Sequence, residues 1–296
     1  TADGTYGSSG EIQLSTGNSN VDATGSIQLK TGSSAKNTGG DIAVEVGSSG
    51  SGSGGALTVA AGDTSGEESA GGSITISAGS STNENSGVGG GVTIQSGSAL
   101  GATGGSVTIL SGRSNRFTSG GVSLSTQNSG SSGASGAVQI SSGTSTGSGT
   151  GSISLTTGDS ASGAAGGISL RSGQGSIARG GSSVGGNVVI GAGASTTTTG
   201  GSIHLSSGRG QQTTSGQIII STQNAGKNGA SGAIALSTGT SSAGASGSLT
   251  LATGSSKEST SGDIKLAAGK SSSGYVGGSV LIGAGQSADQ TGGSIL

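Results

Sequence analysis

The stretch that decides the fold is Gly10-Glu11-Ile12-Gln13-Leu14-Ser15-Thr16-Gly17, and it recurs as Gly25-Ser26-Ile27-Gln28-Leu29-Lys30-Thr31-Gly32. Each copy sets two large apolar residues around one other residue and places Gly at both ends. Because alternate residues of a strand face the same side, Ile12 and Leu14 share one face while Glu11 and Gln13 share the other. The pattern therefore predicts a short, half-buried strand.

This Ile-x-Leu pattern continues to the end of the printed sequence at a nearly constant interval. Only three intervals are clearly longer than the others: Leu57–Ile74, Ile74–Val92 and Ile168–Val188. The extra residues fall in the Gly/Ser-rich return segments, whereas the apolar stretch keeps its length. Such regularity favours a repeat architecture over a flexible linker. The first apolar residues are Ile12, Ile27, Ile42, Leu57, Ile74, Val92, Val107, Val122, Val138, Ile153, Ile168, Val188, Ile203, Ile218, Ile234, Leu249, Ile264, Val280 and Ile295.

The expected fold is all-β: a single continuous parallel β-solenoid rod over residues 1–296, with coils of about 15 to 16 residues. Like residues would stack in columns, with Ile, Leu and Val pointing inward and Gly at the corners. The return segment is either a weak second strand or an extended loop. The handedness of the solenoid is not fixed by the pattern.

A longer period of six repeats is also present. Val88-Gly89-Gly90 recurs as Val184-Gly185-Gly186 and as Val276-Gly277-Gly278, and Ser111-Gly112-Arg113 recurs as Ser207-Gly208-Arg209. The predicted super-repeats span approximately 10–104, 105–200 and 201–292, with a fourth opening at 293–296. Because the last residues stand in the middle of a repeat, we expect a slice of a longer repetitive polymer.

Composition excludes several classes of function. The chain has 69 Gly, no Pro, Cys, Met or Trp, 28% hydrophobic residues, 1% aromatic residues and a net charge of −2. Without Cys there are no disulfides, thiolate metal sites or Cys nucleophiles. The low charge predicts no nucleic-acid partner, and no apolar run is long enough to span a membrane.

Groups with catalytic or ligating chemistry are sparse. His204 is the sole His and is expected on the outward side of its strand. Glu67-Glu68 and Glu84 lie in two return segments, where weak Ca²⁺ capture is the alternative to a solvated loop. Asp41 and Asp263 stand in apolar stretches without a calcium-binding nonapeptide. We therefore predict that the chain is not an enzyme and has no catalytic, cofactor-binding or metal site, and no cofactor.

In architecture the chain resembles the tandem-repeat β-solenoids of surface fibres and adhesins. That resemblance implies an extracellular or cell-surface structural component, a stiff fibre, stalk or appendage that binds itself end to end or laterally. The alternative is an ice-binding or adhesive, carbohydrate-binding solenoid that uses Ser/Thr ladders. A rank of Thr in four consecutive repeats supports this alternative, but it breaks off in the next repeat, at Ser123: Thr58, Thr75, Thr93 and Thr108.

Overall fold

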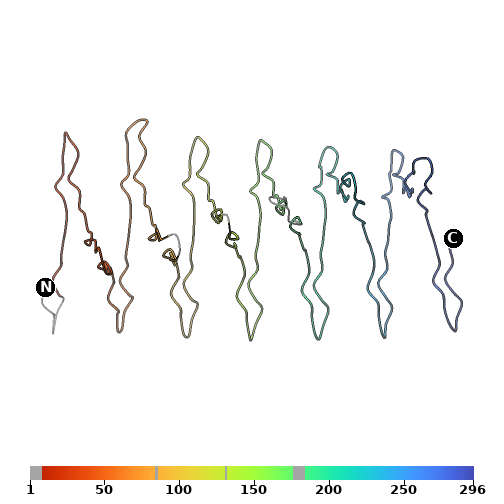
Figure 1. Cartoon of the computed structure of the whole chain (residues 1–296), viewed down its shortest axis with the longest axis horizontal. Coiled ribbons are helices and arrows are strands. Elements are labelled where there is room, and N and C mark those ends of the chain that lie inside the picture. Colours follow the sequence, from red (N-terminus) through yellow and green to blue (C-terminus); the bar gives the residue numbers. More distant parts are fainter. Residues whose placement is uncertain (1–8, 84–85, 131, 176–183) are drawn as a thin grey trace. The chain divides into compact units, whose positions relative to one another are not determined.

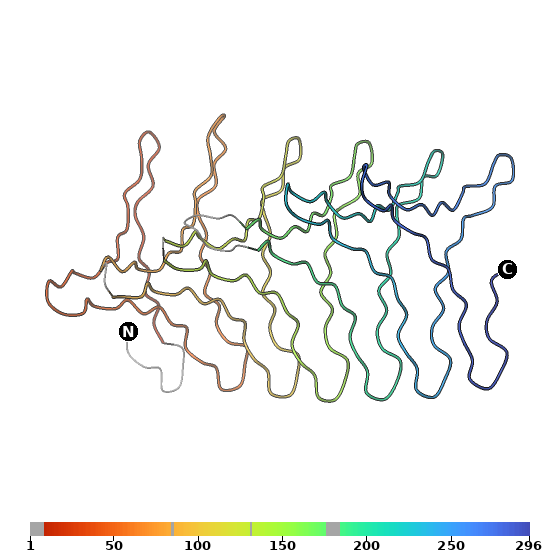
Figure 2. The same cartoon turned by 45° about the vertical axis from the view of Figure 1, so that its right-hand side comes forward.

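The computed structural model describes residues 9–83, 86–130, 132–175 and 184–296, and within these ranges the chain forms no helix and no β-strand. Extended stretches alternate with sharp bends along the chain (Figure 1). The turned view shows the same alternation without a single strand arrow or helical coil (Figure 2). The bends recur in the Gly/Ser-rich return segments, and the extended stretches carry the Ile-x-Leu pairs.

The predicted β-solenoid is wrong for this chain. A solenoid needs ladders of hydrogen bonds between neighbouring coils. In the described ranges, every backbone–backbone hydrogen bond instead spans one loop or closes a four-residue turn, and no residue there is buried. The physical reason lies in the composition. Each repeat offers about two large apolar side chains, whereas its many Gly lose more conformational freedom on ordering than any other residue.

The chain divides into two parts, Thr1–Thr144 and Ser145–Leu296. The division falls inside a return segment, directly before Ser145. Ser145 Oγ accepts a hydrogen bond from the N–H of Ser148 at 3.2 Å, so the second part begins with a local bend. The super-repeat boundaries are a feature of the sequence and do not coincide with this division.

Nine of the described return segments are closed by one backbone hydrogen bond at fixed positions. The donor is the Gly N–H two residues before an apolar pair, and the acceptor is the Gly carbonyl five residues after the start of the preceding pair. In the loop from Gly97 to Gly105, for example, the N–O distance is 2.9 Å. The bond spans loops of different lengths, so inserted residues leave the closure unchanged. The closed loops are 62–72, 79–90, 97–105, 112–120, 173–186, 193–201, 208–216, 269–278 and 285–293.

A second device shapes the tips of the loops. Ten Ser residues, each two positions after a Gly, accept a hydrogen bond on Oγ from the backbone N–H three residues later, at 2.9–3.2 Å. Such a bond bends the backbone locally and competes with regular secondary structure. The return segment is therefore a Ser-stabilised loop, the second of the two alternatives. The ten residues are Ser19, Ser34, Ser49, Ser114, Ser145, Ser160, Ser195, Ser241, Ser256 and Ser287.

Candidate functional site

No pocket and no cluster of three or more His, Asp or Glu residues forms in the described part of the chain. His204 is exposed, and so are Glu67 and Glu68 in their bend. Asp263 contacts Lys265 at 3.5 Å, but both side chains are open to solvent, where such a pair contributes little. Glu84 lies outside the described residues. Nothing in the described ranges brings these groups together.

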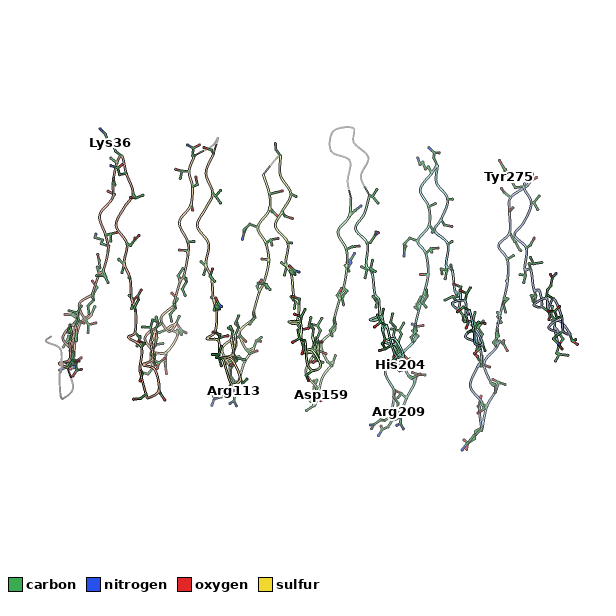
Figure 3. The ribbon with its side chains drawn as sticks, turned by 90° about the horizontal axis from the view of Figure 1, so that it is seen from below. Lys36, Arg113, Asp159, His204, Arg209 and Tyr275 are labelled. Carbon is green, nitrogen blue, oxygen red and sulfur yellow. The ribbon has the colours of Figure 1, made fainter. Side chains whose placement is uncertain are left out.

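The polar and charged side chains are distributed over separate bends. Lys36 and Arg113 belong to the first part, and Figure 3 shows each at its own loop. In the second part, Arg209 stands at the start of one loop and Tyr275 at the bend of another. A recognition site built from charge would need several such groups on one surface. Among the residues that the structure describes, the charged groups thus define no common site.

What the chain does present is a repeated apolar surface. From Ile27 onward, the first residue of each Ile-x-Leu pair keeps 49–65% of its surface exposed, and the second keeps 64–76%. Ordinary cores bury such side chains almost completely. Each apolar pair, with the residue between its two members, is called an apolar segment below. These segments are the candidate functional surface.

The alternation predicted for the apolar segments is partly visible in their exposure. Val188 is 54% exposed and Ile190 74%, whereas Val189 between them is 88% exposed. The residues of the pair are thus more sheltered than the residue between them, as expected if they share one face. The inward column that the solenoid required does not form, because both members of the pair remain exposed.

The total surface shows how much remains uncovered. The chain exposes 29071 Å². A folded monomer of 26.9 kDa is expected to expose about 11,000 Å² and its unfolded chain about 39,000 Å². The chain by itself therefore covers only a minor share of the surface that a globular protein of this mass covers.

Backbone groups in the apolar segments are equally open. Across residues 9–83, 86–130, 132–175 and 184–296, no backbone–backbone hydrogen bond involves an Ile-x-Leu residue. Extended backbone with free N–H and C=O groups is a template for pairing with another chain. Apolar side chains and unpaired backbone thus occur on the same short stretches.

The Thr rank does not form a flat array. Thr58, Thr75, Thr93 and Thr108 are all exposed, but they stand on irregular backbone, since the described ranges contain no sheet. A sheet would hold neighbouring hydroxyls at a fixed spacing of about 4.8 Å. As for membranes, no helix among the described residues is long and apolar enough to span a bilayer.

No protein-family model, curated protein or solved structure matches this chain. The apolar segments and their loops are therefore the observations on which a function must be argued. The sequence reasoning found the segments but missed the loop closures. A signal for them was present, because all nine closing carbonyls follow Ala or Ser in the sequence.

Proposed function

We propose that the chain is a structural component of an extracellular fibre, stalk or surface appendage, in which its apolar segments become covered by neighbouring chains. The observation that carries the proposal is the regular exposure of large apolar side chains, 49–76% in every pair from Ile27 to Ile282. Burial of apolar surface contributes about 25 cal/mol per Å², so surfaces of this kind favour association.

The absence of a built reaction centre in the described ranges fits this role. A filament needs repetition, flexible loops and self-complementary surfaces, and none of these needs convergent titratable groups. The low net charge of −2 also fits, because a strongly charged chain would repel its own copies. An extracellular location is part of the proposal and rests on the resemblance to surface fibres.

The test is the assembly state of the purified chain. Sedimentation velocity and electron microscopy measure it over a range of concentrations. We expect filaments whose formation is concentration-dependent. A double variant, Ile153→Asp with Ile168→Asp, should abolish or strongly weaken assembly, because an unpaired charge would have to be buried.

The matched control carries the same two charges one residue further along, as Ser154→Asp with Ser169→Asp. These positions lie between the members of the apolar pairs, and the control should assemble like the original chain. A chain that stays monomeric at every concentration would overturn the proposal. Thermal hysteresis or specific glycan binding by that monomer would instead support the ice-binding or adhesive alternative.

A further inference from the structure

From Val92 onward the chain repeats its spacing after six apolar segments, and most of its loop closures recur with the same period. The intervals between segments that start at Val92 match those that start at Val188 in order, and only the sixth of each series differs in length. Hydrogen-bonded closures follow the segments at Ile74, Val92 and Val107, and again those at Ile168, Val188 and Ile203. Corresponding closures have similar N–O distances, 2.9 Å at Gly105 and 2.8 Å at Gly201.

We propose that the apolar segments pair edge to edge with those of a second copy of this chain, running parallel and staggered by six segments. This inference rests on the proposed filament function and names its partner and register. The segment at Val138 would lie beside the segment at Ile234 of the second copy. The backbone groups of the two segments would then satisfy one another, and the apolar pairs would lie on one common face.

The area left open argues for a partner with many contacts. The chain exposes 29071 Å², which exceeds the expectation for a folded monomer by about 18,000 Å², whereas a stable interface of standard size buries about 1,600 Å² in total. A small partner would cover only a few segments. A second copy offers apolar segments along its whole length, and its five intervals from Val188 to Ile264 equal those from Val92 to Ile168.

The six-segment stagger fits better than a smaller shift. A shift by one segment would place the interval from Val122 to Val138 beside the shorter one from Val107 to Val122, so later segments would fall out of step. A one-residue slip turns a strand's apolar face to the opposite side. The six-segment shift instead sets the interval from Val122 to Val138 beside the equally long one from Ile218 to Ile234.

Charge distinguishes the stagger from pairing without a shift. Several charged residues lie within the apolar segments or directly beside them. Unshifted copies would place each of these residues beside its own equivalent, and like charges directly opposite are destabilising. After a shift of six segments, Asp263 faces Gly167 and Lys265 faces Ser169. All seven charged residues then face uncharged ones: Glu11, Lys30, Asp41, Glu45, Arg171, Asp263 and Lys265.

The stagger also explains how pairs grow into a filament. A staggered pair leaves segments outside the overlap, and these can pair with a third copy in the same way. Contacts of this head-to-tail kind form open filaments rather than closed dimers. Pairing without a shift would leave no segments outside the overlap, so further copies could add only at the free edges of the paired segments.

The natural lack of Cys makes the register directly testable, because one introduced Cys is unique in each chain. Gln139→Cys, Ala235→Cys and Ser123→Cys each place a thiol between the two members of an apolar pair. The variants are assembled singly and in mixtures, one partner carrying a mass tag, and are then oxidised. Electron microscopy follows filament formation in the same samples.

We expect Gln139→Cys to cross-link with Ala235→Cys about tenfold more than with itself, since matched segments bring the Cα atoms within disulfide range. Preferential self-linkage of Gln139→Cys would show unshifted pairing, and preferential linkage to Ser123→Cys would show a shift by one segment. Either result, or equal linkage of all mixtures in well-formed filaments, would overturn the register while leaving the filament function intact. If no filament forms, the proposed function itself fails.

Discussion

Two neighbouring regions of the second part differ in how their loops are held. The loops 193–201 and 208–216 are each closed by a Gly–Gly hydrogen bond, at 2.8 and 2.9 Å. The loops 239–247 and 254–262 have the same length, but no backbone hydrogen bond joins their two ends, although every residue in them is described. The regions are called the closed-loop and open-loop regions below.

One side chain per loop accounts for the difference. In the closed-loop region the residue before the first Gly is Ala192 or Ser207, and in the open-loop region it is Thr238 or Thr253. In each case the side chain of this residue is the one that a Cβ on the Gly at the far end of the loop would meet. In the open loops the Thr Cγ2 methyl lies 3.8 Å from the place where a Cβ on Gly247 or Gly262 would stand. Ala and Ser lack that methyl, and the two ends of their loops are joined by the Gly–Gly bond.

The same correlation extends along the chain, among the loops that lie within one of its two parts. All nine closed loops follow Ala or Ser, whereas eight return segments with Thr or Val at that position have no cross-loop bond among the described residues. Among these loops, closure therefore correlates with an unbranched side chain before the first Gly and not with loop length.

The largest expected effect comes from filling the far Gly. A Cβ at Gly201 would lie 3.3 Å from Ala192 Cβ and 3.3 Å from Gly193 N, whereas one at Gly247 meets nothing nearer than 3.8 Å. Gly201→Val should therefore destabilise its loop by about 1–3 kcal/mol through overcrowding. Hydrogen exchange at the position 201 amide should accelerate strongly, and Gly247→Val, the control in the open-loop region, should leave its own loop unchanged. Equal effects at both sites would contradict the proposed difference in packing.

Exchanging the deciding residue should convert one loop type into the other. Ala192→Thr adds the methyl that separates open loops, so the Gly201–Gly193 bond should be lost, at a cost of about 0.5–1.5 kcal/mol. Thr238→Ala should allow the N–H of Gly247 to reach the carbonyl of Gly239. The measurement is the through-bond NMR coupling across each hydrogen bond, and Ala192→Ser, which keeps the loop closed, is the control. A bond that persists in Ala192→Thr would show that another feature closes the loop.

The sequence predicted where the apolar segments lie but not which loops are closed by a hydrogen bond. The positions and spacing of the apolar segments followed directly from Ile-x-Leu periodicity, and their alternation is seen at Val188, Val189 and Ile190. The burial of those segments was predicted wrongly, because periodicity describes which residues share a face and not what covers that face. His204 was expected on the outward side of its strand from the alternation at Ile203 and Leu205, and it is exposed on irregular backbone. Loop closure was missed because it depends on a contact between Gly and one branched side chain.

A smaller effect is expected from the Ser bonds at the loop tips. Ser241 Oγ accepts from Gly244 N in an open loop, and Ser195 Oγ accepts from Thr198 N in a closed one, both at 3.0 Å. Ser241→Ala removes the one hydrogen bond that the structure gives its loop. The bent conformation of the loop should lose about 1 kcal/mol of stability, and the loop should become more mobile. Ser195→Ala should change less, because the Gly–Gly bond still holds the loop. Backbone ¹⁵N relaxation measures both, and a larger response in Ser195→Ala would contradict the prediction.

The smallest effect concerns two closed loops that contain a tight turn. Glu68 has φ 58° in the turn closed by Ser69 N and Gly66 O, whereas Gly274, at the same place in the turn of Ser272 and Tyr275, has φ 94°. A left-handed conformation costs a non-Gly residue about 1–2 kcal/mol. Gly avoids this cost, but it loses more conformational entropy than other residues when the turn forms, which costs about 0.5–1 kcal/mol. The first term is larger, so Glu68→Gly should stabilise the turn by about 0.5 kcal/mol and slow exchange of the Ser69 amide roughly twofold.

The reverse change, Gly274→Glu, should destabilise its turn by a similar amount and speed exchange of the Tyr275 amide. The pair tests the backbone angle separately from the closing bond, because Gly62–Gly72 and Gly269–Gly278 should keep their hydrogen bonds in both variants. If Glu68→Gly instead accelerated exchange at Ser69, the Glu68 side chain would be contributing more to the turn than its φ angle costs.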